Sequence, residues 1–221
     1  MKIKFNNNKR TNFNMKAKKN YKKTIVSRLK GGLGNQLFIY AASYSLALKN
    51  NARLLLDDVT GFDRDFKYNR NYSLDFLNIS ADKANSKDLL IPFFRIRRLF
   101  YRLLFLFNIS KKRVFYFQKG VGFDSKFISY KFDSDILFFD GFGQSEKYFK
   151  DIRSDIKKEF SFKNKSEVNK FANKIFKKNS VAVHFRFFDK KNYNSKINLK
   201  DDYYKMAISE ICLKLDNPVF Y

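Results

Sequence analysis

A glycine-rich turn, GGLGN at residues 31–35, joins a short apolar run to a segment with helical spacing. Glycines 31, 32 and 34 permit positive φ and close approach of a ligand, and Asn35 is placed to cap the following helix. The first N–H groups of that helix could bind a phosphate or a sugar hydroxyl. Leu37 replaces the third glycine of GxGxxG and no GK[ST] follows, so the turn is neither a dinucleotide fingerprint nor a P-loop. A tight strand-to-helix turn with no ligand explains the same residues equally well.

The second group of reactive side chains lies in VAVHFRFFD at residues 181–189. Strand alternation puts His184, the only histidine, and Arg186 on one face, with Asp189 just beyond. Ligands of open α/β sheets bind at the carboxyl ends of strands.

Other candidate sites are weaker. Asp63-Arg64-Asp65 and Asp133-Ser134-Asp135 have the D-x-D spacing of metal-dependent sugar transferases, but both stand in polar stretches where charged loop residues are the default. A single histidine gives little support to a zinc site or a Ser-His-Asp arrangement. We therefore predict no metal.

The elements that must position these residues alternate between strands and helices. Residues 24–29 and 53–57 have the composition of strands and flank a helix that runs through Leu48, which makes a β-α-β unit. A further strand is expected at residues 136–140, helices at 145–160 and 166–177, and a last helix and strand before the end of the sequence. The fold class is α/β. We expect a basic extension at 1–23, a first lobe at 24–175 and the start of a second lobe at 176–221.

The chain carries a formal charge of +25 at pH 7, a balance typical of proteins that bind nucleic acid or anionic membranes. Much of it lies in the first 23 residues and in the segment 92–113, where arginines alternate with phenylalanines and leucines. A packed helix whose arginine stems cover apolar neighbours explains that segment. A helix on an acidic membrane surface explains it too, whereas a nucleic-acid patch finds less support because no binding motif is present. Codon bias toward lysine could also supply charge without function.

The cellular location follows from what the sequence lacks. A single cysteine, Cys212, cannot form an intramolecular disulfide and fits a reducing compartment. The amino terminus has no apolar h-region of a secretory signal, and no apolar run is long enough to span a membrane. We expect a cytoplasmic protein, with peripheral contact at the inner face of the plasma membrane as an additional possibility.

Three stretches together resemble the bacterial α-1,2-fucosyltransferases of glycosyltransferase family 11. They are RLKGGLGNQLFIYAASYSLALKNNARLLLD, DGFGQSEKYFKDIRSDIKKEF, and VAVHFRFFD followed by DDYYKMAISEI. The resemblance covers about residues 24–221. It implies a two-lobed GT-B-type enzyme, with a Rossmann-type first lobe and an incomplete donor-binding lobe. Such enzymes move fucose from GDP-fucose to the 2-hydroxyl of a terminal galactose, inverting the anomeric centre without an obligatory metal or other cofactor, and build surface glycans such as lipopolysaccharide O-antigen.

The resemblance also implies roles for single residues. Arg186 meets the GDP pyrophosphate, His184 shapes the pocket, and the turn of the first lobe faces the cleft, with Gly32, Gly34, Asn35 and Gln36 near the sugar and phosphate. Arg186 and Asp189 are the catalytic candidates, because a guanidinium can hold two phosphate oxygens and a carboxylate can accept the proton of the acceptor hydroxyl. Asp189 has two other possible roles, which are to orient Arg186 and to cap the loop. Phe187 and Phe188 stand where the family has a second arginine and a glycine, and the sequence ends before the family's S-D-D motif. We therefore expect a truncated family member, active or decayed. The alternative is a basic, non-catalytic module for nucleic acid or anionic membrane, which depends on the extension and on Arg95, Arg97, Arg98 and Arg102.

Overall fold

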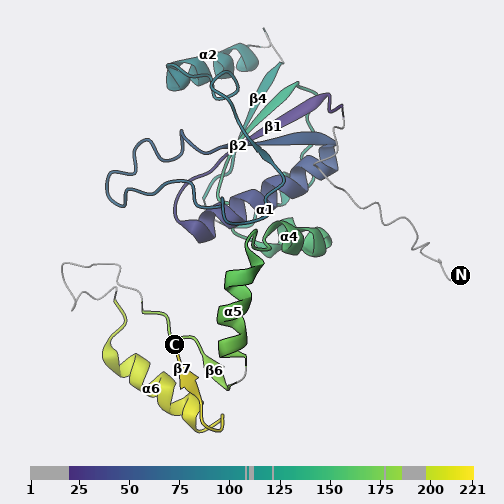
Figure 1. Cartoon of the computed structure of the whole chain (residues 1–221). Coiled ribbons are helices and arrows are strands. Elements are labelled where there is room, and N and C mark those ends of the chain that lie inside the picture. Colours follow the sequence, from purple (N-terminus) through teal and green to yellow (C-terminus); the bar gives the residue numbers. More distant parts are fainter. Residues whose placement is uncertain (1–19, 108, 110–111, 121, 177, 186–197) are drawn as a thin grey trace, which may run out of the picture. The chain divides into compact units, whose positions relative to one another are not determined.

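Five parallel strands form the central sheet of the computed structural model, in the order β3-β2-β1-β5-β4 (Figure 1). The structure describes residues 20–107, 109, 112–120, 122–176, 178–185 and 198–221. These residues divide into two compact units, one ending at Lys163 and one beginning at Asn164. The predicted α/β class with a Rossmann-type first lobe is confirmed by the parallel sheet. The wider GT-B architecture stays a prediction.

The β-α-β unit predicted around the glycine-rich turn is present. It consists of β1 (Lys23–Arg28), α1 (Leu33–Asn50) and β2 (Ala52–Asp57). The two strands pair in parallel from Lys23 beside Ala52 to Arg28 beside Asp57. Arg28 and Asp57 are therefore neighbours at the carboxyl end of the sheet.

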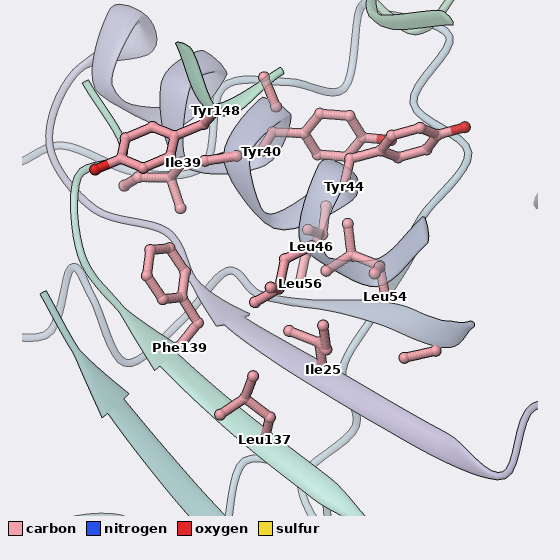
Figure 2. Close-up of a cluster of buried hydrophobic side chains, with 14 of the residues drawn as sticks. Ile25, Ile39, Tyr40, Tyr44, Leu46, Leu54, Leu56, Leu137, Phe139 and Tyr148 are labelled. Atoms are coloured by element: carbon pink, nitrogen blue, oxygen red, sulfur yellow. The ribbon is translucent and has the colours of Figure 1, made fainter. Parts of the chain in front are cut away.

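The main core lies between α1 and one face of the sheet (Figure 2). Ile25, Leu54, Leu56 and Leu137 of the strands pack beneath a helix whose residues 39–47 are all buried. An apolar stripe would leave one helix face in water, so burial around the whole circumference means that other segments cover α1 from outside. This explains why the helix tolerates so few charged residues.

The segments outside α1 are α3 (Ser125–Ile128), two short 3₁₀ turns, η1 (Glu146–Tyr148) and η2 (Lys150–Ile152), and α4 (Arg153–Glu159). The sequence predicts one helix through residues 145–160, but the structure breaks it into these turns and α4. Ser145 caps the first turn as expected, since its side chain accepts from Lys147 N. The Tyr40 hydroxyl of α1 donates to Glu159 Oε2 at 2.6 Å. Burial, followed by the Glu159 carboxylate, raises the pKa of Tyr40 well above its ordinary value.

The opposite face of the sheet carries a smaller core and one helix, α2 (Phe94–Leu106). Val26, Leu55 and Phe138 point to this side, and Phe94 and Tyr101 of α2 pack against them. The chain then enters β4 (Arg113–Phe117) at one edge of the sheet and inserts β5 (Ile136–Asp140) between β4 and β1. The strand β5 is confirmed, whereas β4 and the two-residue β3 (Asp82–Lys83) were not predicted.

The second unit contains α5 (Lys165–Ile175), β6 (Ser180–Val181), α6 (Asp201–Cys212) and β7 (Val219–Phe220). The two short strands pair in parallel, with Ser180 beside Val219 and Val181 beside Phe220. The helix α5 groups with this unit, although the sequence analysis assigned it to the first lobe. The nine-residue strand expected at 181–189 is wrong in the part that the structure describes, because β6 ends at Val181 and residues 182–185 lie outside any strand.

Candidate functional site

A pocket of about 590 Å³ opens at the carboxyl end of the sheet in the first unit. It is lined by residues at or near the ends of β1, β5 and β4, by one side of α2, and by the loop after β2. We call it the basic pocket. Its cations and carboxylates are Arg28, Lys30, Arg64, Arg70, Arg95, Arg98 and Arg102, and Asp63, Asp65 and Asp140.

The strand order explains why a pocket forms here. From β1 the chain moves outward through β2 to β3, and then returns to build β4 and β5 on the other side of β1. The connection from β1 to β2 therefore runs through α1 on one face of the sheet, whereas the connection from β3 to β4 runs through α2 on the opposite face. Such a switch point leaves a crevice outside the carboxyl ends of the strands, which is where open α/β sheets bind ligands.

Asp140, the last residue of β5, joins two cations at the centre of the pocket. Its carboxylate oxygens lie 2.5 Å from Lys30 Nζ and 2.8 Å from Arg28 Nη1. Burial alone would raise the pKa of Asp140, but the hydrogen bonds and charges of Lys30 and Arg28 outweigh it and hold the pKa below its usual value. Asp140 is therefore ionised at neutral pH and serves as an anchor for these cations.

The loop after β2 is held against the end of β1. Arg28 donates from Nε to Thr60 Oγ1 at 3.2 Å and from Nη2 to Thr60 O at 2.5 Å. At Gly61 a Cβ atom would lie 1.7 Å from Leu29 O, so only glycine fits between the loop and the strand. This contact fixes the wall that carries residues 63–65.

Arg98 of α2 reaches inward to the end of β2. Its Nη2 donates to Oδ2 of the fully buried Asp57 at 2.7 Å. Asp57 also accepts from Thr60 N at 2.8 Å and from Thr60 Oγ1 at 2.5 Å. One carboxylate thus ties α2, β2 and the following loop together behind the pocket.

Cations engage both carboxylates of the first D-x-D pair and Asp133 of the second. Asp63 pairs with Arg95 and lies 3.9 Å from Arg28, and Asp65 lies 3.9 Å from Arg70. Asp133 precedes β5 and so lies at the amino-terminal end of the strands, away from the pocket, where it pairs with Lys23 at 3.2 Å. Over the residues that the structure describes, no group of three or more acidic, histidine or cysteine side chains is placed to hold a metal ion.

The surplus of positive charge in the pocket is not fully neutralised. Arg64 and Arg102 have no carboxylate partner in the described part of the chain, and the Arg102 guanidinium lies over the Phe117 ring at 4.5 Å. Aromatic rings of β4, β5 and α2 also line the pocket. Guanidinium groups beside apolar rings suit a ligand with an anionic part and a flat, less polar part, as in a sugar phosphate or nucleotide.

The glycine-rich turn departs in detail from the prediction. Positive φ occurs at Gly31, at 74°, whereas Gly32 is the extended N-cap residue of α1 and Gly34 lies inside the helix. Asn35 also lies in the first turn, so it does not cap α1. Its Oδ1 accepts from Gln144 Nε2 at 2.7 Å, and it lines the basic pocket together with Gly31. Gly32 and Gly34 are not among the lining residues, although Arg70 Nε approaches the Cβ position of Gly32 to 3.9 Å.

Gln36 is fully buried and acts as a structural clamp. Its Nε2 donates to Gly31 O at 3.0 Å and to Asn71 O at 2.9 Å, and its Oε1 accepts from Ser73 N at 2.9 Å. The side chain therefore presents no surface to a ligand. The expectation that Gln36 contacts the sugar or phosphate is corrected to a supporting role, in which it fixes the turn that carries Gly31 and Asn35.

The predicted residues of the second unit are only partly described. His184 is exposed, and the next residue, Phe185, packs on the Tyr204 ring of α6 with centroids 4.3 Å apart. Arg186 and Asp189 lie outside the described residues, so their predicted contact with pyrophosphate and their catalytic roles stay predictions.

Sequence reasoning missed most of the basic pocket. The predicted strands at 53–57 and 136–140 each end in a carboxylate, Asp57 and Asp140, and Arg28 ends β1. Because parallel strands have their carboxyl ends on the same side of the sheet, the position of these residues at strand ends indicated that they could lie together in a site. The contribution of α2 had no such signal, since nothing in the sequence places Arg98 beside Asp57.

Comparison with known proteins gives one curated relative. The chain is 31% identical over 170 residues to an alpha-1,2-colitosyltransferase of Escherichia coli. The match covers 73% of this chain and 53% of the relative, so the chain spans about half the length of that protein. No protein-family model matches the chain. Among solved structures, the fucosyltransferase NodZ from Bradyrhizobium is 14% identical, and the alignment covers 87% of this chain and 65% of NodZ. Its TM-score of 0.39 is too low to establish a shared fold.

Proposed function

We propose that this chain acts as a glycosyltransferase, and that it moves fucose from GDP-fucose to the 2-hydroxyl of a terminal galactose in a surface glycan. The observation that carries this proposal is the 31% identity with the alpha-1,2-colitosyltransferase over 170 residues. The basic pocket adds physical support, because a nucleotide sugar is anionic and the pocket holds seven cations against three carboxylates.

The reaction is an inverting displacement. The acceptor oxygen forms a bond to the anomeric carbon while the bond from that carbon to the β-phosphate oxygen breaks, so GDP leaves with the bonding electron pair. Negative charge grows on the β-phosphate and the sugar becomes oxocarbenium-like. A fixed guanidinium at the phosphate stabilises this transition state more than the ground state.

We assign the phosphate contact to Arg186 and the removal of the acceptor proton to Asp189. Arginine suits the first role because its planar group binds two phosphate oxygens at once, which lysine cannot do. We assign the basic pocket to an anionic or hydroxyl-rich part of a substrate, with Gly31 and Asn35 on its wall. No step requires a metal ion or another cofactor.

Colitose is a second candidate for the donor sugar, because the relative is a colitosyltransferase. Colitose differs from fucose in lacking the 3-hydroxyl, so a site that hydrogen-bonds this hydroxyl would reject colitose strongly. A site that packs an apolar group there would accept both sugars. We propose fucose first and keep colitose as the competing donor, because the residues that would contact this position are not identified.

The test measures transfer of labelled fucose, and of colitose in parallel, from the GDP sugar to a β-galactoside by the 221-residue chain. We expect product that an α-1,2-specific fucosidase releases, with equal yield in magnesium and in EDTA. Donor binding is followed separately as the thermal shift with GDP, for which saturation predicts a rise of about 5 °C or more.

Two variants make the thermal shift specific. Arg186→Ala should abolish stabilisation by GDP. Arg53→Ala, which removes an exposed arginine of β2 that pairs with Asp82, should leave this stabilisation intact. Absence of any shift with GDP, together with absence of transfer, would overturn the proposed function. A shift that both variants retain would contradict the role of Arg186.

A further inference from the structure

An exposed apolar stripe runs along the outer side of α2. Six of its large side chains are between 43% and 71% exposed: Ile96, Leu99, Phe100, Leu103, Leu106 and Phe107. At 100° per residue these positions fall within one continuous sector of the helix and its C-cap. A stripe of this kind normally faces the core of a soluble protein, whereas here it faces away from the sheet.

The inner side of the same helix explains this orientation. Phe94 and Tyr101 pack against the sheet, and Arg98 is held by the buried Asp57. These three residues lie on the side opposite Ile96 and Leu103, so α2 cannot turn its apolar stripe inward without breaking a buried ion pair. The inner side thus agrees with the packed helix that the sequence allows, because Arg98 lies over the Phe94 and Phe138 rings, and the apolar stripe on the outer side stays exposed.

Cations border the stripe on both sides. Arg95 and Arg102 project toward the basic pocket and Arg97 lies on the other flank. The sequence has no acidic residue between Asp88 and Asp124. A second copy of α2 laid against the first would bring like charges together, whereas anionic headgroups would meet the arginines while acyl chains receive the apolar side chains. We infer that α2 is a docking surface for an anionic lipid bilayer.

The docked helix lies in the plane of the membrane. It has 13 residues, and no helix in the described part of the chain is long and apolar enough to cross a bilayer. Arg95, Leu99 and Arg102 also line the basic pocket, so docking brings the pocket close to the headgroups. Together with the proposed transferase activity, on which this last step rests, the geometry points to an acceptor carried at the membrane surface.

Vesicle sedimentation of the full chain, without any sugar substrate, tests the docking surface independently of catalysis. We expect binding to phosphatidylcholine vesicles that contain roughly 30% phosphatidylglycerol and little binding to phosphatidylcholine alone. The triple variant Ile96→Ser, Leu103→Ser and Phe107→Ser keeps every charge and touches no pocket residue, and should lower the partition coefficient about tenfold or more. Arg97→Gln should lower it about fivefold.

The matched control removes three apolar side chains of similar exposure from the second unit. Phe171→Ser, Met206→Ser and Leu213→Ser, at positions 60%, 70% and 82% exposed, should bind vesicles like the wild type. Equal binding by the α2 triple variant and the wild type would overturn the inference, because the net charge alone would then explain binding. Equal binding of the wild type to neutral and anionic vesicles would also overturn the inference. A dimer in solution that the α2 triple variant dissociates would overturn it too, because a second copy of the chain would then be the occupant of the stripe.

Discussion

The ion pair between Arg98 and Asp57 gives the sharpest test of how α2 is held to the sheet. Asp57 is 0% exposed and the Arg98 side chain is 15% exposed, so water screens the pair poorly. Arg98→Met keeps much of the side-chain volume but removes the cation. The Asp57 carboxylate is then left with neutral donors alone, namely the Thr60 amide, the Thr60 hydroxyl and the Val59 amide.

The size of the effect follows from these contacts. Removing one partner of a buried ion pair costs about 3–5 kcal/mol, and the three remaining hydrogen bonds favour the lower end of that range. Arg98 Nε has no hydrogen-bond partner and is buried, so its loss removes one unsatisfied donor and lowers the cost further. We expect Arg98→Met to reduce the free energy of unfolding by about 3 kcal/mol, and Arg98→Lys, which keeps the charge, by about half as much.

A double-mutant cycle separates the pair from general damage to packing. Asp57→Asn with Arg98→Met removes both charges, so the double variant should be at least about 1.5 kcal/mol more stable than the sum of the single variants predicts. Urea unfolding is followed by near-ultraviolet circular dichroism, because the buried tyrosines 40, 44 and 148 lie in the first unit. A cost below about 1 kcal/mol for Arg98→Met, or additive single variants, would refute the energetic coupling of Arg98 to Asp57.

Two further predictions concern pH. Asp140 has a lowered pKa in the folded chain, so its contribution to stability is present above the unfolded value of about 3.9 and disappears as pH falls through the folded value. In urea unfolding, Asp140→Asn should cost about 1–3 kcal/mol at pH 7 and progressively less as pH falls below about 3.9. The pKa values of Tyr44 and Tyr72 are raised to about 12 and that of Tyr40 is raised well above its ordinary value, so the stability that these phenols contribute is full below about pH 10 and is lost as pH rises toward about 12. Phenolate absorbance at about 295 nm, free of tryptophan, should show the exposed tyrosines ionising first and these buried ones together with unfolding. Early, reversible titration of all tyrosines would contradict their burial.

Local patterns were sufficient for the first half of the fold. The run TIVSRL, the helical spacing after it and the run RLLLD each agree with the element that forms, and their order requires a parallel β-α-β unit. The apolar spacing at 145–160 predicts one helix, but the structure has two 3₁₀ turns before α4. Just ahead of these turns Gly143 packs against α1, where a Cβ would lie 2.7 Å from Ala42 Cβ. Packing against a distant element cannot be read from spacing within one segment.

The candidate site shows the same limit. Spacing drew attention to the turn at residues 31–35, and Gly31 and Asn35 do line the basic pocket. The neighbouring Gln36 looked equally suited to a substrate, because an amide beside a glycine turn has the same composition whether it faces a ligand or a loop. Its clamp depends on Asn71 and Ser73, which come from a stretch without periodicity. Whether Gln36 faces the pocket or the loop at 71–73 depends on the direction of its side chain in the first turn of α1, and the fold sets this direction.

The ion pair between Arg98 and Asp57 also determines which side of α2 is exposed for membrane binding. A basic, apolar helix can bury its leucines and phenylalanines against the sheet, and nothing in the composition of α2 prevents that. The buried Asp57 prevents it, since a carboxylate at the end of β2 draws one guanidinium under the helix and leaves the opposite side, centred on Leu103, outward. If this reasoning is correct, replacing Asp57 and Arg98 together by apolar residues should preserve stability and yet weaken vesicle binding, because α2 would then be free to roll its stripe onto the sheet.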